Sequence, residues 1–323
     1  MRVVWVTRFG GPEVLAVGEA PDPIAGAGEV VIEVAVADVL FLDTQLRSGW
    51  GREYFDLEPP YVPGSGVVGR VIATGQGVDP GWAGRDVVAI VAAGGYAERV
   101  VARAEGLARV PGGLGMPTAA ALVQTGPAAL SLLDAAPLQR GEWVLVMPAA
   151  GGLGILLVQL ARRAGARVIA AAGGQPKLQL ARDLGAETVV DYAAEGWAER
   201  VRDAAGGAGP AVVLDGVGGR VGLAAFEAAA DGSRFFAYGV PAGAFAAIDP
   251  AQAAGRGIKV TGIEQVQFTP AQVARLAGRV LAEAATGRIR PVIGRTFSLE
   301  AAADAHAAVE GRAVVGRTLL VVR

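Results

Sequence analysis

The sequence predicts a two-domain α/β protein, in which an antiparallel, barrel-like domain accompanies a doubly wound parallel sheet. Three observations lead to this prediction. The chain has 323 residues, more than the size at which one hydrophobic core usually stops growing. Short β-branched runs broken by glycine and proline fill its first 122 residues. Beyond them, strands alternate with helical segments, which are the crossovers that parallel neighbours require.

The expected elements follow this plan in order. An alternating first strand covers residues 1–7, and further strands of the first domain are expected at 29–36, 67–74 and 86–91. One helix is expected over 118–135, followed by the apolar strand 143–147. The other strands of the parallel sheet are expected at 167–171, 188–190, 211–214, 234–238 and 258–261.

The C-terminal part completes the domain plan. A helix is expected at 269–286, and residues 296–323 have the pattern of a strand, a helix and a strand. We expect this tail to return to the first domain. The predicted boundaries are therefore 1–122 for the barrel-like domain, 123–265 for the parallel sheet and 266–323 for the returning segment.

Composition excludes several functional classes. Hydrophobic residues make up 52% of the chain and charged residues 19%, which indicates a large buried core and not disorder. The net charge is −2, without a run of five like charges, so nucleic acid and anionic membranes are not expected partners. The alternating N-terminus is unlike a signal peptide, and no apolar run reaches the roughly 18 residues of a membrane span, so we expect a cytoplasmic protein.

The strongest motif follows the apolar strand 143–147. Its letters are PAAGGLG, residues 148–154, and a helical segment comes next, which is the structural context of a dinucleotide-binding turn. Small residues let the backbone approach a pyrophosphate at the helix N-terminus, and Gly154 lets the helix pack close to the sheet. We expect cofactor contacts from Ala150, Gly151, Gly152, Leu153 and Gly154.

The end of the second parallel strand indicates which cofactor is bound. NAD sites usually carry an acid there to bind the ribose hydroxyl, whereas this strand ends in Gly173 and Gly174, with Lys177 soon after. A lysine beside open glycine backbone attracts a 2′-phosphate that a carboxylate would repel. NADPH is therefore the predicted cofactor. The alternative is that Lys177 is only a solvated residue of the next helix.

The sequence predicts that no metal is bound. The chain has no cysteine and a single histidine, His306, so it cannot build the usual zinc site of nitrogen and sulfur ligands. His306 lies in an alanine-rich helical segment and is interpreted as a structural or surface residue. The chain also lacks the GxSxG elbow, the phosphate-binding GxxxxGK[ST] loop and a tyrosine followed four residues later by lysine.

Several motifs together resemble one enzyme family. The resemblance is to the zinc-free quinone oxidoreductases (zeta-crystallin-like) of the medium-chain dehydrogenase/reductase superfamily. It is carried by four segments that have the same order along the chain as in that family: PYVPGSGVVGRV, GGYAERVVA, AAALVQTGPAALSLLDAAPLQRGEWVLVMPAAGGLG and AAADAHAAVEGRAVVGRTLL. The resemblance implies a GroES-like catalytic domain, a Rossmann domain and an active site in the cleft between them. It also implies a homodimer joined through the Rossmann domain. The cofactor contacts that it adds are Gln124, Tyr192, Gly216, Val217, Gly239, Val240 and Ile263.

The chain departs from the family pattern at positions that matter for chemistry. Zinc-dependent relatives carry metal ligands at the positions of Leu40 and Ser65, and neither residue can replace them. Leu40 also stands where quinone oxidoreductases commonly carry an asparagine, Ala128 where they carry a threonine, and Gly66 where an aspartate is frequent. These changes remove polar groups from the implied cleft and point to an apolar or unusual substrate.

The candidate catalytic residues are Asp43, Arg47 and Tyr54, with Tyr61 and Tyr96 as further polar candidates. Arg47 or a tyrosine can stabilise a developing enolate. The alternative is that Asp43 and Arg47 only cap or pair locally and that the tyrosines only pack.

The resulting hypothesis is an NADPH-dependent reductase of a quinone or α,β-unsaturated carbonyl compound. Two others stay open: a reductase dedicated to one biosynthetic ene intermediate, and an NADPH-binding sensor or structural protein with little turnover.

Overall fold

The computed structural model describes residues 1–312 and 314–322. These residues form two compact units: residues 1–127 together with 268–323, and residues 128–267. The helix α3 (Thr125–Ala135) begins in the first unit and ends in the second. The tail of the chain thus belongs to the unit that contains the N-terminus.

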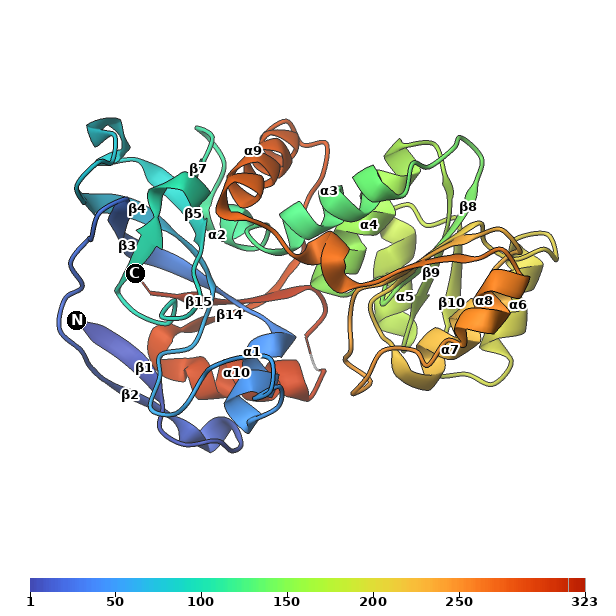
Figure 1. The fold of residues 1–323 in the computed structure, drawn as a ribbon, viewed down its shortest axis with the longest axis horizontal. Helices are drawn as coiled ribbons and strands as arrows, with labels where there is room; N and C mark the ends of the chain where they lie inside the picture. Colours follow the sequence, from blue (N-terminus) through green and yellow to red (C-terminus); the bar gives the residue numbers. More distant parts are fainter. Residues whose placement is uncertain (313, 323) are drawn as a thin grey trace. The chain divides into compact units, whose positions relative to one another are not determined.

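The first unit is built on a sheet with the order β14-β15-β3-β4-β5-β7, in which β6 also pairs with β3. All of its pairings are antiparallel except β14 with β15. Figure 1 shows the C-terminal strands β14 and β15 beside the N-terminal ones. The bounds are β3 (Glu29–Val39), β4 (Gly66–Thr74), β5 (Asp86–Ile90), β6 (Arg99–Arg103), β7 (Ala108–Arg109), β14 (Ile293–Ser298) and β15 (Arg317–Val321).

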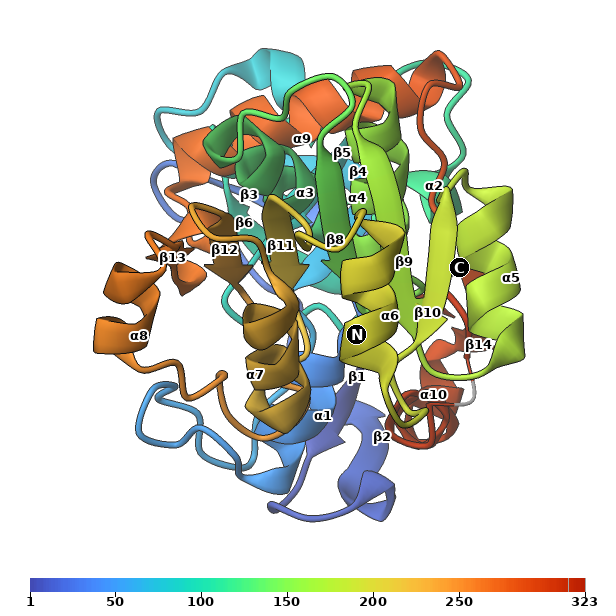
Figure 2. The same cartoon turned by 90° about the vertical axis from the view of Figure 1, so that its right-hand side faces the viewer.

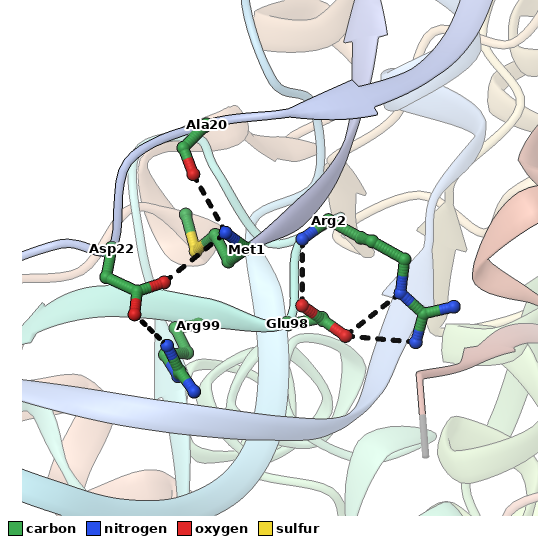
Figure 3. A network of polar contacts seen from close by, with 6 residues as sticks. All are labelled: Met1, Arg2, Ala20, Asp22, Glu98 and Arg99. Carbon is green, nitrogen blue, oxygen red and sulfur yellow. Dashed lines mark hydrogen bonds and ion pairs between the residues drawn. The ribbon is translucent and has the colours of Figure 1, made fainter.

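A separate two-stranded sheet starts the chain, with β1 (Arg2–Val6) antiparallel to β2 (Leu15–Glu19). Polar contacts fasten it to the segment before β6, as Figure 3 shows. The Arg2 backbone N–H and Nε both donate to Glu98, at 2.8 and 3.0 Å. Asp22 accepts from Arg99 and lies 3.4 Å from the Met1 amino group. Because these groups are partly exposed, the packing of the buried Val3, Val4 and Val6 contributes more to stability than the ion pairs do.

Two helices of the first unit pack against each other, α1 (Phe41–Ser48) and α10 (Ala302–Glu310). The unit also contains α2 (Met116–Ala120) and α9 (Pro270–Ala285), which starts with a Thr269 cap on the Gln272 N–H. Its apolar core combines alternating residues of the central strands, such as Val30, Ile32 and Val34, with Leu299, Ala302 and Ala305 of the tail. The tail therefore forms part of the core of this unit.

The second unit is a six-stranded, fully parallel sheet with the order β10-β9-β8-β11-β12-β13. Figure 2 shows α6 and α7 in front of this sheet. Its strands are β8 (Trp143–Met147), β9 (Arg167–Ala172), β10 (Thr188–Asp191), β11 (Val212–Asp215), β12 (Arg234–Ala237) and β13 (Lys259–Thr261). Its helices are α4 (Gly152–Arg163), α5 (Gln175–Asp183), α6 (Trp197–Ala204), α7 (Gly219–Ala228) and α8 (Pro250–Gly255).

The order in which the strands are added to the sheet reverses at β8. The chain moves outward from β8 through β9 to β10, then returns to the other side of β8 at β11. In a doubly wound sheet, ligands bind beyond the carboxyl ends of the strands at such a switch point. The α/β fold class predicted from the sequence, with its antiparallel and doubly wound parallel sheets, is confirmed.

The single helix expected over residues 118–135 was wrong. The structure has α2, which ends at Ala120, and a separate α3, which begins at Thr125, with turns between them. The physical reason is Pro127, which has no N–H to donate and is tolerated only in the first turn of a helix. The apolar periodicity of this stretch continues through the break and conceals it.

Two kinds of feature are absent from residues 1–312 and 314–322: a helix that could span a membrane and a cluster that could hold a metal ion. No helix there is both long enough and apolar enough to cross a membrane. Among the same residues, no three His, Cys, Asp or Glu side chains gather closely enough to hold a metal ion.

Candidate functional site

The glycine-rich turn lies at the carboxyl end of β8, where α4 begins. The first N–H groups of a helix have no partner within the helix, and Gly151 at the N-cap supplies no side chain to bond them. No acidic side chain stands in the first turn. These amides and the helix dipole therefore form a site for an anion.

Gly154 explains how α4 comes so close to β8. A Cβ atom at this position would lie 2.0 Å from the Pro148 carbonyl oxygen and 2.9 Å from the Ala149 Cα. A Cβ at Gly151 would make contacts of 3.4 Å, which are ordinary. Of these two glycines, Gly154 is required by helix packing, and Gly151 leaves space on the ligand side of the turn.

Two further loops meet at the same edge of the sheet, beyond β11 and β12. Gly216 donates its N–H to the Met147 carbonyl at 2.7 Å, and a Cβ at Gly239 would lie 2.6 Å from the Gly216 oxygen. Tyr238 donates its hydroxyl to Met147 at 3.3 Å. The predicted loop residues Gly216, Val217, Gly239 and Val240 therefore lie at the switch point with the turn after β8.

Asp215 holds the first of these loops in shape. Its Oδ1 accepts the N–H groups of Val217 and Gly218 at 2.8 and 3.0 Å. Burial raises the pKa of this carboxyl group, and its Oδ2 has no hydrogen-bond partner within the described structure. A Cβ at Gly222 of α7 would lie 2.3 Å from that oxygen, so the carboxyl group is confined between its loop and the helix.

A second group of predicted residues lies at the carboxyl ends of β9 and β10. Gly174 has a φ of +85° and starts α5, which places Lys177 in the first turn of that helix. The Tyr192 ring lies next to Gly173, 3.5 Å from the position of a Cβ there. Gly173, Gly174, Lys177 and Tyr192 therefore lie together at the carboxyl ends of β9 and β10.

An acid also reaches this corner, which the sequence interpretation did not foresee. The second strand carries none, but Asp191 at the end of β10 accepts the Gly174 N–H at 3.2 Å and the Ala193 N–H at 2.9 Å. β10 pairs in parallel with β9, with Asp191 opposite Ala172, so the ends of the two strands coincide. The signal was present in the letters VVDY, but only strand register shows that the carboxylate reaches Gly174.

Two predicted cofactor residues do not join these groups. Gln124 belongs to the first unit, where its amide donates to the Ser65 hydroxyl at 3.2 Å. Ile263 starts the short helix η4 (Ile263–Val266) after β13, and its side chain is 40% exposed. The rest of the predicted cofactor residues, including buried Ala150, surround the carboxyl edge of the parallel sheet.

The first unit contains a cavity of about 150 Å³ beside α1. Its lining residues are mainly apolar, and three of them, Asp43, Tyr61 and Ser65, are polar. The other lining residues are Leu42, Leu46, Phe55, Leu57, Pro63, Gly64, Ala92 and Ala93. The cavity is therefore suited to a small, largely apolar molecule with one polar group.

Asp43 is both the cap of α1 and part of this lining. Its Oδ2 accepts the Leu40 N–H at 2.8 Å, and the side chain is 4% exposed. Burial raises the pKa of Asp43 to about 7, despite the lowering effect of the Leu40 N–H. The local cap that was the alternative interpretation of Asp43 is thus present, in a carboxyl group that also borders the cavity.

Tyr96 and His306 continue from Asp43 into the core. The Tyr96 hydroxyl lies 3.3 Å from Asp43 Oδ2 and 3.1 Å from His306 Nε2, and both rings are fully buried. A Cβ at Gly64, whose φ is +87°, would lie 2.2 Å from the Tyr96 ring, so only glycine fits there. Burial lowers the pKa of His306 to about 3, which leaves its imidazole neutral at physiological pH.

Arg47 is buried beside these hydrogen-bonded side chains and pairs with Glu310 at the end of α10. It also faces His306, whose pKa it helps to lower. Its Nε and Nη1 have no hydrogen-bond partner among the residues that the structure describes. Arg47 therefore joins α1 to α10 through a partner 263 residues away, and not through the local pairing that was its alternative role.

Tyr54 is not brought together with Asp43 and Arg47. It lies in the turn after α1, and its side chain is 74% exposed. Tyr61, by contrast, borders the cavity, and burial together with the Asp43 carboxylate raises the pKa of its hydroxyl to about 12.

The structure gives a physical reason for one departure from the family pattern. A Cβ at Gly66 would lie 2.7 Å from Val123 and 2.8 Å from the Gln124 amide, so these side chains occupy the space of the frequent aspartate. Gln124 instead bonds Ser65, whose position is that of a zinc ligand in zinc-dependent relatives.

Sequence reasoning missed three residues: Asp191 at the carboxyl edge of the parallel sheet, and Glu310 and, as a hydrogen-bond partner, His306 in the first unit. His306 and Tyr96 are 210 positions apart, and Glu310 and Arg47 are 263 apart. No local pattern connects residues at such separations, since only the return of the tail to the first unit brings them together.

Comparison with known proteins identifies relatives over the whole chain. The alcohol dehydrogenase GroES-like domain matches residues 26–112, and the zinc-binding dehydrogenase family matches residues 152–279. The quinone oxidoreductase of Sus scrofa is 30% identical over 327 residues, with 99% of this chain and 97% of that protein covered.

Two similar solved structures contain NADPH. The Escherichia coli quinone oxidoreductase complexed with NADPH is 27% identical, has a TM-score of 0.93 and covers 100% of both chains. A mycobacterial protein complexed with NADPH is 34% identical, with a TM-score of 0.92 and the same coverage. These complexes agree with the cofactor predicted from the sequence.

Proposed function

Since this chain belongs to the zeta-crystallin-like quinone oxidoreductase family of the medium-chain dehydrogenases and reductases, we propose that it reduces a quinone or an α,β-unsaturated carbonyl compound with NADPH, without zinc. The observation that carries the proposal is the turn after β8, where Gly154 brings the helix N-terminus against the strand and leaves its amides for a pyrophosphate. The NADPH complexes of two relatives support the same assignment.

The residues of the parallel-sheet unit fit this cofactor. The turn at Gly151 and Gly152 would hold the pyrophosphate, and Lys177 with Tyr192 would bind the 2′-phosphate. Gly216, Val217, Gly239 and Val240 would follow the cofactor along the edge of the sheet. When bound, NADPH supplies the hydride, and the protein orients the reactants and excludes water.

The cavity beside α1 is the proposed substrate site. Its apolar lining would hold the carbon skeleton, and Asp43, Tyr61 and Ser65 would meet the polar end. Because Arg47 is paired with Glu310, we assign it to positioning α1 and not to contact with the substrate. No role in the reaction is proposed for the exposed Tyr54.

Independence from zinc is supported by the residue types themselves. Leu40 and Ser65 stand at the ligand positions of zinc-dependent relatives, and the chain has no cysteine and one histidine. That histidine is fully buried and bonded to Tyr96. The site therefore lacks the ligand set of a catalytic zinc.

A dedicated ene reductase of a biosynthetic intermediate is the second candidate, favoured by the apolar lining of the cavity and by the loss of polar groups at Leu40, Gly66 and Ala128.

An assay of NADPH consumption against a panel of simple quinones and enones tests the proposal. Turnover with simple acceptors favours the first candidate, and turnover only with extended enoyl compounds favours the second. A protein that binds NADPH tightly but consumes none with any acceptor would instead be a sensor or structural protein.

A further inference from the structure

A reduction of this type needs a proton as well as a hydride, and the proposed function leaves its source open. Three of the residues that line the cavity have polar side chains: Asp43, Tyr61 and Ser65. The Tyr61 hydroxyl is a weak acid, since burial and the Asp43 carboxylate raise its pKa to about 12. A serine hydroxyl is weaker still. Asp43 is thus the strongest acid of the lining, and burial raises its pKa to about 7, where a carboxyl group can both give and regain a proton.

The hydrogen bonds that link Asp43, Tyr96 and His306 accommodate both protonation states of the Asp43 carboxyl group. An ionised Asp43 only accepts, so Tyr96 donates to its Oδ2, and His306 Nε2 then donates to the Tyr96 oxygen. A protonated Asp43 donates to the Tyr96 oxygen, and Tyr96 then donates to Nε2. His306 Nδ1 has no partner within the described residues, so either tautomer is available.

The charged groups nearest Asp43 lie on the elements that pack around it. Asp38 of β3 and Arg317 of β15 form a buried pair, with 3.1 Å between Arg317 Nε and Asp38 Oδ1. Their effects on Asp43 oppose each other, because Asp38 raises its pKa and Arg317 lowers it. Arg47 of α1 is paired with Glu310 of α10. Tyr61 and neutral His306 complete the surroundings, so the arginines are matched by acids and burial decides the state of Asp43.

From this arrangement we infer that Asp43 is the proton donor of the reduction, and that Tyr96, held by His306, is the positioning residue that orients its carboxyl group. The inference rests on the proposed function.

The atoms and electrons of this step balance as follows. The hydride supplied by NADPH forms a C–H bond at the β-carbon of the enone, and the carbon–carbon π pair moves to give an enolate. The Asp43 carboxyl group transfers its proton to the α-carbon, where the enolate pair forms the new C–H bond. The carboxylate that remains takes a proton from water through the cavity, and the net reaction consumes one NADPH and one proton. With a quinone, the same proton goes to oxygen.

The test replaces Asp43 by asparagine, whose amide oxygen still accepts from Leu40 and Tyr96 and so preserves the cap of α1. The control is Asp86→Asn, which removes an exposed partner of Arg70 in the same unit. With an enone substrate, kcat of the native enzyme and of the control should fall as pH rises above about 7. Asp43→Asn should be at least about a hundredfold slower and show no such decrease, since general acid catalysis contributes 10²–10⁴-fold.

Reduction in D2O identifies the donor directly. The native enzyme should deliver deuterium to one face of the α-carbon, whereas Asp43→Asn should give both faces, because solvent then protonates a free enolate. A variant that retains kcat within twofold overturns the inference. Deuteration of a single face by the slow variant also overturns it, since another group would then be the donor.

Tyr96→Phe tests the positioning role. It removes a hydrogen bond that stabilises ionised Asp43, so the alkaline decrease in kcat should move up by about one pH unit. A residue that is only structural would lower kcat without moving this decrease, and that result overturns the role assigned to Tyr96.

An infrared titration without cofactor or substrate separates this inference from the proposed function. The native protein and Asp86→Asn should share a protonated-carboxyl band with a midpoint near pH 7. The difference spectrum against Asp43→Asn should assign this band to Asp43 and separate it from the bands of other buried carboxyl groups such as Asp215. Absence of this band from the native protein overturns Asp43 as the donor, whatever the substrate. A native protein that shows the band but consumes no NADPH with any acceptor contradicts the proposed function.

Discussion

The proposed 2′-phosphate site, at the carboxyl ends of β9 and β10, combines a cation and an anion. Lys177 stands in the first turn of α5, and the Asp191 carboxylate bonds the Gly174 N–H three residues earlier in the chain. A 2′-phosphate at this corner is attracted by the first and repelled by the second. If the 2′-phosphate binds here as proposed, cofactor preference is a balance of two side chains from neighbouring strand ends.

Lys177→Ala should weaken NADPH binding by about tenfold to a hundredfold, because a charge-assisted hydrogen bond is worth roughly 1.5–3 kcal/mol. NADH has no phosphate to lose, so its affinity should stay nearly unchanged. Fluorescence titration of both cofactors at one salt concentration measures the difference. Equal weakening of the two would mean that Lys177 acts through the fold.

Asp191→Asn should have the opposite effect and strengthen NADPH binding by about twofold to fivefold, the range of a single exposed charge pair. The amide oxygen still accepts the Gly174 N–H, so the corner keeps its shape while the negative charge is lost. The gain should shrink as salt rises, since the groups are exposed. Asp183→Asn at the far end of α5 is the control. A gain for NADH as large as that for NADPH would contradict a charge effect on the phosphate.

Individual elements were predictable where local sequence determines them. The strand 143–147 was expected at the bounds that β8 has, because a short apolar run between turn residues has few alternatives. The helix at 118–135 was wrong because apolar periodicity outweighed Pro127 in the interpretation. The cofactor edge could be predicted because glycine turns identify it. The buried hydrogen bonds between Asp43, Tyr96 and His306 could not be predicted, because these residues come from α1, the segment before β6 and α10.

The junction of β8 and α4 offers a test at the scale of an element. Gly154→Ala should destabilise the protein by about 1–3 kcal/mol and weaken NADPH binding, because its Cβ would meet the Pro148 carbonyl at 2.0 Å and push the helix outward. Gly151→Ala is the control for folding, since its Cβ makes only ordinary contacts. Thermal unfolding and NADPH titration of both variants measure the effect. Equal stability of the two would show that the helix does not need this close approach.

At the scale of the whole molecule, β13 is one of the two edge strands of the parallel sheet, the other being β10. Val260 of β13 is 42% exposed, and an unpaired apolar edge strand is a site for association. We predict an isologous dimer that extends the sheet across a two-fold axis. Val260→Lys should give a monomer by light scattering at micromolar concentration. Ile72→Lys on β4, where Ile72 is 45% exposed, should leave the native state of association unchanged. A native protein that is monomeric at that concentration contradicts the prediction.

The central claim is that this chain transfers a hydride from NADPH to a conjugated carbonyl acceptor without a metal. Transfer of label tests it most directly. The protein is treated with a strong chelator, shown by elemental analysis to hold no zinc, and given an enone with NADPH deuterated at the C4 hydrogen that is transferred. The account predicts deuterium at the β-carbon of the product, at the rate of the untreated protein. Product without deuterium, or activity that disappears with the metal and returns with added zinc, would contradict it.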